Sequence, residues 1–149
     1  MSPFLKWYRL SFRDRFLLFK TFLILVGIRL GLFLMPLKNF RRFLRWTATT
    51  SPVKSDHRDQ DLGKAIWAIA SVGKYILGDG PCLTQALAAQ QLLIRHNRQS
   101  ELCIGVAKDS RGKLVAHAWV ESDGVVIIGG SEDSVKQYTK LPSLEEKLF

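Results

Sequence analysis

The sequence has few of the residues that build metal sites or disulfide frameworks. It contains two cysteines and three histidines in 149 residues, and no Cys-x-x-Cys or His-x-x-x-His spacing. So few cysteines exclude a disulfide-stabilised scaffold and favour a reduced, cytoplasmic setting. Zinc is disfavoured because the available ligands fall on separate predicted elements; they are Cys82, Cys103, His96 and His117. We therefore predict no metal and no cofactor.

Acidic residues are nearly missing from the first third of the chain. Residues 1–50 contain ten Lys or Arg and one acid, Asp14, which leaves a net charge of +9. Residues 51–149 contain twelve residues of each sign and are neutral. This asymmetry predicts a basic, hydrophobic helical region over residues 1–55 and a folded domain over residues 56–149.

No uncharged apolar run reaches the roughly twenty residues that a membrane-spanning helix needs. The most apolar segment, residues 11–35, opens with Ser11-x-x-Asp14, which resembles a capping box, and is predicted to be a helix. Its uncharged stretch between Lys20 and Arg29 has only eight residues. We expect this helix to pack on the domain or on a partner, with peripheral contact at the inner face of the membrane as the open alternative. No small-residue cleavage site of a secretory signal follows it.

A second basic helix is predicted over Leu37–Trp46, where phenylalanines are interleaved with arginines. Such interleaving occurs in nucleic-acid-binding proteins, but no nucleic-acid-binding motif accompanies it here. The pattern is more typical of an amphipathic interface helix, so we expect no nucleic acid as a partner. A polar linker is expected over Thr47–His57.

The rest of the chain predicts helices followed by strands. Apolar residues at helical spacing predict two helices, and alternation bounded by turns predicts three strands; the segments are Asp61–Leu77, Cys82–His96, Glu101–Lys108, Lys113–Glu121 and Val125–Ile128. The tail from Ser131 has little periodicity. Two helices followed by an antiparallel meander predict an α+β fold.

Cys82 and His117 are the candidate catalytic residues. Cys82 opens a predicted helix directly after Gly80-Pro81, and a helix N-terminus lowers the pKa of a thiol and offers unpaired N–H groups to an oxyanion. His117 lies inside a strand expected to pack beneath that helix, where it could act as the base. Each residue alone would more often be structural, but the pair is the layout of a papain-like or transglutaminase-like thiol site. Cys103 lies in an apolar strand pattern and is expected to be a buried core residue.

Three segments carry a resemblance to a known family; they are Pro81–Leu93, Ser100–Val106 and Ala116–Glu121. Their order and spacing resemble the lasso-peptide leader peptidases, which are cysteine peptidases of the transglutaminase-like superfamily. The resemblance covers roughly residues 62–141. The apolar region before it, which contains several arginines, also resembles that family. It implies that Cys82 is the nucleophile and His117 the base.

The resemblance also implies partners. The activity that it implies is removal of the leader peptide from a ribosomally synthesised precursor, after which an ATP-dependent lasso cyclase closes the freed core peptide. A small recognition protein holds the leader, and some relatives carry it as a fused module. Residues 1–55 are predicted to form apolar helices and are too few to contain that module, so we expect the recognition protein to be a separate chain.

The third catalytic residue stays open. Family members commonly place an aspartate on the strand after the hairpin, but here that strand, Val125–Gly130, contains no acid. Asp123 lies at the hairpin tip, too far along the strand from His117. Glu132 or Asp133 could fold back, or a backbone carbonyl could orient the imidazole of a Cys–His dyad. Two other functions stay open, a transglutaminase-like acyltransferase and a catalytically degenerate scaffold in a membrane-side complex.

Overall fold

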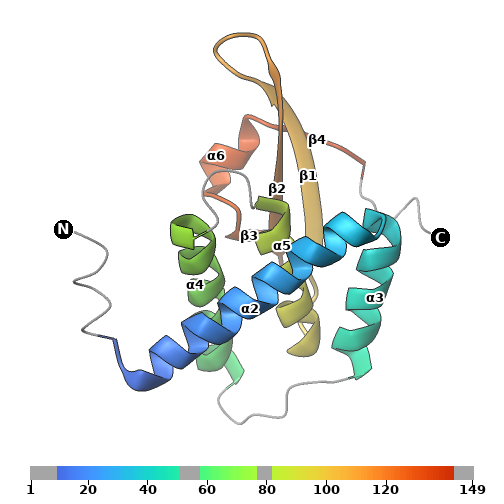
Figure 1. The fold of residues 1–149 in the computed structure, drawn as a ribbon. Coiled ribbons are helices and arrows are strands. Elements are labelled where there is room, and N and C mark those ends of the chain that lie inside the picture. The colour runs from blue at the N-terminus through green and yellow to red at the C-terminus, as the bar shows by residue number, and fades with distance from the viewer. Residues whose placement is uncertain (1–9, 51–57, 77–81, 143–149) are drawn as a thin grey trace.

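The computed structural model describes residues 10–50, 58–76 and 82–142 (Figure 1). The elements in these residues are, in chain order, α2 (Phe12–Leu34), α3 (Leu37–Thr50), α4 (Arg58–Ile76), α5 (Cys82–Arg95), β1 (Glu101–Lys108), β2 (Leu114–Ser122), β3 (Val125–Ile128), α6 (Glu132–Lys136) and β4 (Thr139–Lys140). The four strands form one antiparallel sheet in the order β3-β2-β1-β4. The predicted α+β fold, with a cysteine-bearing helix packed on an antiparallel sheet behind an apolar N-terminal helix, is confirmed.

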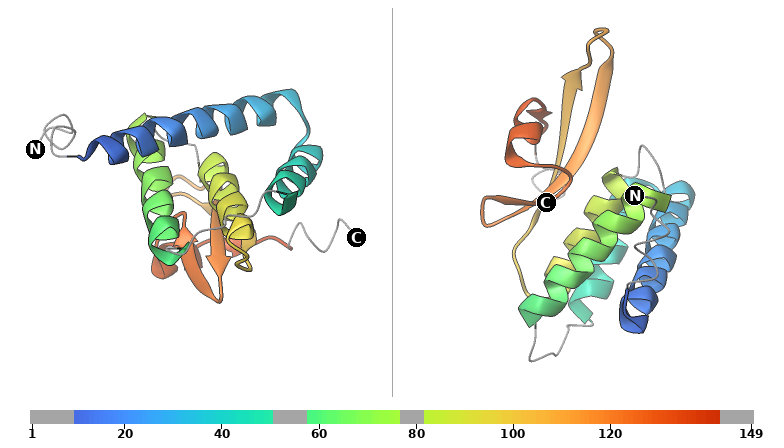
Figure 2. Two further views of the ribbon diagram at one scale, coloured as in Figure 1. Left: turned by 90° about the horizontal axis from the view of Figure 1, so that it is seen from below. Right: turned by 90° about the vertical axis from the view of Figure 1, so that its left-hand side faces the viewer.

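Helices α2, α3, α4 and α5 form two layers on one face of the sheet (Figure 2). Helix α5 contacts β1, β2 and β3 on one side, and α2, α3 and α4 on its others. Its buried residues are mostly small or aliphatic, which lets the neighbouring elements approach it closely; they include Ala86, Leu87, Ala88, Ala89 and Leu93. Helix α2 crosses the outer side of α4 and α5, so α5 is enclosed between α2 and the sheet.

Strand alternation gives the sheet two different faces. Leu102, Ala118 and Val120 join the main core with the helices. Cys103 and Trp119, which are partners in the β1–β2 register, point to the opposite face and pack with Val135 of α6 in a second cluster. Figure 2 shows α6 on the side of the sheet away from the other helices.

Two expectations about the ends of elements are wrong. The linker predicted from Thr47 begins later, because α3 runs on to Thr50. Ala48 is buried in the core, and the hydroxyls of Thr47, Thr49 and Thr50 donate to carbonyls one turn back. Ser11 precedes α2 without a side-chain capping hydrogen bond, so the predicted capping box is absent.

The tail after Ser131 is more ordered than its weak periodicity predicted. Ser131 and Ser134 form a reciprocal capping box that starts the short helix α6, with two acids in its first turn. Residues Thr139 and Lys140 then pair with β1 as β4. The turn predicted at Gly78–Pro81 and the rest of the linker, 51–57, lie outside the described residues.

Helix α2 is longer than its uncharged stretch suggested. It has 23 residues, and an 18-residue window within it has a mean hydropathy of 2.1, so by length and composition it could cross a bilayer, contrary to the expectation that the segment is too short. A core helix of a soluble protein and an N-terminal signal sequence share these properties, so they do not show a membrane span. Four residues of α2 are buried, at a spacing that defines one face; they are Leu18, Thr21, Leu25 and Ile28.

The buried face of α2 belongs to the same core as the rest of the protein. Leu25 and Ile28 lie in one cluster with residues of α4, α5 and the sheet, and Phe40 and Leu44 of α3 join them. The division of the chain into two parts at residue 55 stays a prediction. Whether α2 unfolds together with the rest of the protein can be measured.

We predict that Leu25→Ala lowers the free energy of unfolding by about 2–5 kcal/mol, because Leu25 is fully buried and its loss leaves a cavity. The matched control Leu23→Ala removes a side chain that is 53% exposed and should change stability by less than about 0.5 kcal/mol. Denaturant titration of both variants measures the difference. Equal stabilities would mean that α2 does not unfold together with the domain.

Candidate functional site

Cys82 is the first residue of α5 and is half-buried. Its side chain packs against the main core, and it is a free cysteine. The first N–H groups of a helix have no intrahelical acceptor, so the end of α5 can donate to an anion that forms beside this thiol. The predicted position of Cys82 at a helix start is therefore confirmed, while its role stays a prediction.

His117 is half-buried near the middle of β2, and aromatic rings surround it. Its ring is stacked on Trp119, with centroids 6.1 Å apart, and on Tyr138, with centroids 5.1 Å apart. Its Nε2 donates a hydrogen bond to the carbonyl oxygen of Gly129. Both rings and this carbonyl restrict the rotation of the imidazole.

The bond to Gly129 decides which tautomer the neutral ring adopts. A carbonyl oxygen only accepts, so Nε2 of His117 must carry the proton. Nδ1 then keeps its lone pair, and it is the nitrogen available to take a proton from a thiol. This is the arrangement that a general base requires, reached with a backbone carbonyl in the place of a carboxylate.

Two glycines make room for this arrangement. Gly105 is the register partner of His117, and a Cβ there would lie 2.8 Å from Cβ of Tyr138 and 2.9 Å from the ring of Trp119. At Gly129 a Cβ would lie 2.6 Å from Cβ of Trp119, and the φ angle is +104°. The sequence indicated no role for either Tyr138 or Gly105. Tyr138 lies outside the segments quoted for the resemblance, and Gly105, within Ser100–Val106, gains its role only from the strand register that sets it opposite His117.

The acidic candidates for the third position do not contact the imidazole in the described residues. Glu132 and Asp133 are exposed on α6, and Asp133 pairs with Lys136 at 3.3 Å. Asp123 lies in the β2–β3 turn with a φ angle of +52°. The backbone carbonyl of Gly129, which was the remaining alternative, is the acceptor that the structure places beside His117.

Cys82 and His117 lie on elements that touch, but their side chains are not joined. Helix α5 packs on β2, on the face that Ala118 and Val120 present, whereas the His117 ring lies with Trp119 on the other face. Within the described ranges, no hydrogen bond connects the Cys82 thiol to the His117 imidazole. The catalytic pair stays a prediction.

Strand β3 ends before it reaches the part of β2 that carries His117. Strand β3 pairs with β2 only from Val120 to Ser122, so the part of β2 that carries His117 has β1 on one side and no described strand on the other. The chain that follows β3 lies along this edge instead, since Gly129 packs against Trp119 and its carbonyl oxygen accepts from His117.

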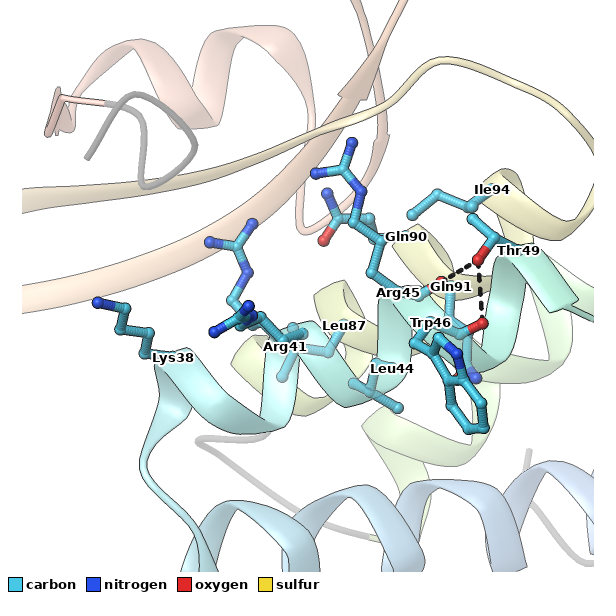
Figure 3. A pocket seen from close by; sticks show the side chains of 11 residues that line it. Lys38, Arg41, Leu44, Arg45, Trp46, Thr49, Leu87, Gln90, Gln91 and Ile94 are labelled. Carbon is cyan, nitrogen blue, oxygen red and sulfur yellow. Dashed lines mark hydrogen bonds between the residues drawn. The ribbon is translucent and has the colours of Figure 1, made fainter. Parts of the chain in front are cut away.

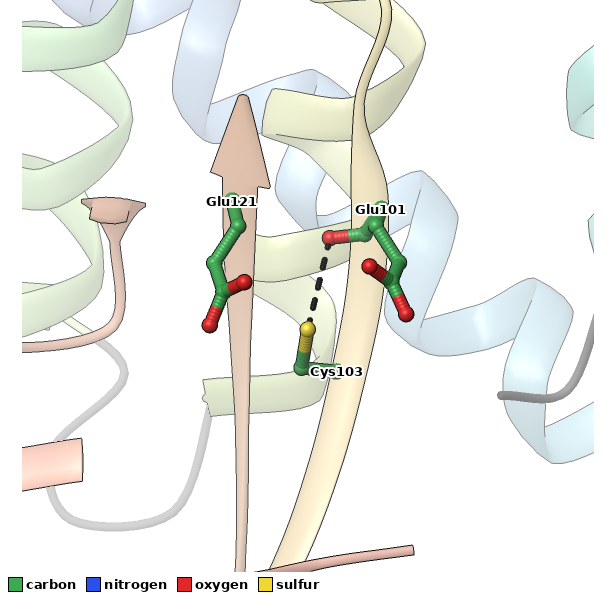
Figure 4. A group of neighbouring side chains, drawn as sticks. All are labelled: Glu101, Cys103 and Glu121. Carbon is green, nitrogen blue, oxygen red and sulfur yellow. Dashed lines mark hydrogen bonds between the residues drawn. The ribbon is translucent and has the colours of Figure 1, made fainter. Parts of the chain in front are cut away.

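Cys103 lies in a different environment, beside two carboxylates (Figure 4). The ligand atoms of Glu101, Cys103 and Glu121 lie within 4.8 Å of one another, a spacing that could suit a metal ion. Lys140 lies among them, with Nζ 3.5 Å from Oε2 of Glu101 and 3.4 Å from Oε2 of Glu121. The ammonium group of Lys140 already pairs with both carboxylates and offsets one of their two negative charges, so the cluster is a poor cation site.

Burial raises the pKa of the Cys103 thiol to about 11, although Lys140 opposes the shift. The pKa of Glu121 is lowered, chiefly by the hydrogen bond that Nε1 of Trp119 donates to its Oε1 at 2.8 Å. A thiol with so high a pKa is protonated at neutral pH and is a poor nucleophile. The expectation that Cys103 is a buried strand residue is confirmed.

A basic cavity of about 680 Å³ lies between α3 and α5 (Figure 3). Four of its lining residues are cationic, and they all come from α3; they are Lys38, Arg41, Arg42 and Arg45. Helix α5 contributes Gln90 and Gln91, and Gln91 donates to the hydroxyl of Thr47 at 3.1 Å. Neither Cys82 nor His117 lines this cavity, so it is separate from the candidate catalytic residues.

We predict that Gly129→Ala is more destabilising than Gly124→Ala. Both glycines have a positive φ, which costs about 1–3 kcal/mol for a residue with a side chain. A Cβ at position 124 meets nothing within 4 Å, whereas at 129 it meets the backbone of Trp119 at 2.7 Å. Thermal and denaturant unfolding of the two variants measures the difference, and equal losses would show that the Trp119 contact is unimportant.

We also predict that the native chain alkylates slowly at Cys103. With a pKa of about 11, the thiol is about 0.1% ionised at pH 8, and the rate should rise roughly tenfold per pH unit until it levels off near pH 11. Iodoacetamide labelling with peptide mass spectrometry gives the profile of this cysteine. A plateau already at pH 9 would contradict the prediction, and labelling in denaturant is the control.

Comparison with known proteins identifies the domain. No curated protein and no solved structure gives a significant match. One family model, described as the transglutaminase-like superfamily, matches residues 23–143, which is most of the chain. Members of this superfamily are typically cysteine-based enzymes, a chemistry to which Cys82 at the start of α5 and the oriented imidazole of His117 are suited. The chain belongs to the transglutaminase-like superfamily.

Proposed function

We propose that this protein is a cysteine peptidase that removes the leader peptide from a lasso-peptide precursor, with Cys82 as nucleophile and His117 as base. The observation that carries the proposal is the tautomer of His117. Its Nε2–H is held by the carbonyl of Gly129, so Nδ1 is left as a base in a superfamily whose chemistry is thiol chemistry. The leader-peptide substrate rests on the resemblance of the segments around Cys82, Cys103 and His117.

The reaction proceeds in two stages. Nδ1 of His117 takes the proton of the Cys82 thiol, and the thiolate sulfur forms a bond to the scissile carbonyl carbon. The tetrahedral oxyanion then collapses, the C–N bond breaks, and the imidazolium returns its proton to the leaving amine. Water, deprotonated by Nδ1, cleaves the thioester, releases the leader as a carboxylic acid and restores the thiol.

Helix α5 supplies the electrostatic part of the site. Its first N–H groups point out of the helix beside Cys82 and have no intrahelical acceptor. They stabilise the negative charge of the thiolate and of the oxyanion, which are the charges that develop in the reaction. The first turn of the helix contains no acid that would oppose this effect.

In this proposal the two catalytic groups meet only when the peptide is bound. Strand β3 ends opposite Val120, and Cys82 begins the helix that packs on the same strand. In the structure the two side chains lie toward opposite faces of the sheet, so the proposal requires the start of α5 to shift relative to β2 when the peptide binds, which would bring the Cys82 sulfur to Nδ1 of His117. Catalytic contacts often tighten only in the complex with substrate.

The partners are proposed on the same resemblance. A separate recognition protein holds the leader and raises the effective concentration of the scissile bond. An ATP-dependent cyclase consumes the freed core peptide, and the reaction takes place in the cytoplasm or at the inner face of the membrane.

We predict that Cys82→Ala and His117→Ala each abolish leader removal while leaving the fold intact. The matched control Cys103→Ala should keep most of the activity, because the Cys103 thiol is protonated at neutral pH. The assay incubates the chain with precursor, with and without the recognition protein, and follows the products by mass spectrometry. Circular dichroism checks the fold of each variant.

The outcome separates the rival functions. Release of a leader that ends in a free carboxylate supports the peptidase, whereas a leader joined to an added amine supports an acyltransferase. An active Cys82→Ala variant with an inactive Cys103→Ala variant would overturn the assignment of the nucleophile. No reaction of the intact chain with precursor and recognition protein would favour the degenerate scaffold.

A further inference from the structure

Helix α2 presents a continuous apolar stripe to solvent. Seven large apolar residues, spaced by about one or two turns, share the face opposite the one buried on α4 and α5; this outer stripe consists of Phe12, Phe16, Phe19, Leu23, Leu30, Phe33 and Leu34. Their exposed fractions range from 53% for Leu23 to 88% for Phe33. Monomeric proteins rarely expose so large an apolar patch without a partner.

The outer stripe is bordered by cations along both sides. By helical geometry, exposed Arg13 and Lys20 lie along one border, and exposed Arg15 and Arg29 along the other. Asp14, the single acid of residues 1–50, lies on the side that faces the protein and is half-buried. The surface is thus apolar at its centre and positive at its margins.

This pattern fits one occupant better than the others. A second copy of the chain would set these four cations against their own counterparts, which repel. An anionic lipid surface matches both features. Its acyl chains contact the apolar centre, and its phosphates pair with the long, flexible cationic side chains at the margins. The helix is about 35 Å long, so the contact is extended and lies in one plane.

The packing of α2 on the domain limits the orientation in which this helix can contact a membrane. The inner face of α2 is occupied, because Leu18, Leu25 and Ile28 are buried in the core with α4 and α5. A transmembrane orientation would pull these residues out of the domain, whereas a helix lying in the membrane plane keeps them packed. Figure 2 shows α2 as the outermost layer, with the sheet on the far side of the molecule.

We propose that α2 docks the enzyme onto an anionic bilayer, with its axis in the membrane plane and its outer stripe inserted among the lipids. The catalytic domain then sits on the membrane surface, with the sheet facing away from the lipid.

The test is flotation of the full chain with vesicles of phosphatidylcholine alone and with vesicles that also contain phosphatidylglycerol. The intact chain should float with the anionic vesicles and much less with the neutral ones. The combined Phe16→Ser, Leu23→Ser and Phe33→Ser variant should lower the bound fraction by about tenfold or more. The control Leu114→Ser with Val125→Ser also replaces exposed apolar residues, but away from α2, and should bind like the unmodified chain.

A charge variant tests the margins. Replacing Arg13, Lys20 and Arg29 with glutamine should weaken binding at low salt and reduce its salt dependence, because screened attraction between the cations and the lipid phosphates is lost. Thermal unfolding confirms that each variant keeps its fold.

Three results would overturn the proposal. One is equal binding of the stripe variant and the unmodified chain. Another is a dimer in light scattering that the stripe variant converts to a monomer. The third is retention of the chain in vesicles after alkaline carbonate extraction, which would indicate a membrane span.

Discussion

The enclosure of α5 between α2 and the sheet is the constraint on which the rest of the structure depends. Leu87 and four neighbouring small or aliphatic residues of this helix are buried, so the layers on both sides approach it closely. Their packing fixes the axis of α5 and with it the position of Cys82 at its N-terminal end. The same packing orients β2, because Ala118 and Val120 fill the space under the helix. Cys82 and β2 are therefore held by one core, although their candidate catalytic side chains point to different faces.

Side chains and backbone on the opposite face of the sheet orient the imidazole of His117. Trp119 and Tyr138 stack on the His117 ring, and Gly129 accepts from its Nε2. Gly105 and Gly129 lack the Cβ atoms that would displace these rings. A backbone carbonyl lies where a catalytic triad would have a side-chain acid. A neutral acceptor still selects the tautomer, but it stabilises an imidazolium less than a carboxylate would, so in the proposed mechanism the helix dipole at Cys82 has a larger part in balancing the charges.

The N-terminal third contributes both to the core and to the surface of the protein. One face of α2 completes the main core, and the other carries the outer stripe with its cationic margins. Within the described residues, the cations of this third are carried by α2, the outermost helix, and by α3, whose cations line the basic cavity.

The sequence by itself determined the α+β class, the three strands of the meander, the start of α5 at Cys82 and the burial of Cys103, since periodicity and a proline before a helix are local signals. It also determined the charge asymmetry. It did not reveal the helical extension through Thr50, the ordered tail after Ser131 or the contacts of Tyr138, because these depend on neighbours distant in sequence. Only the tertiary structure decided which face of the sheet His117 occupies and which atom accepts from its ring. Strand alternation predicts that His117 and Trp119 share a face, but packing of α5 and α6 on opposite sides decides which face that is.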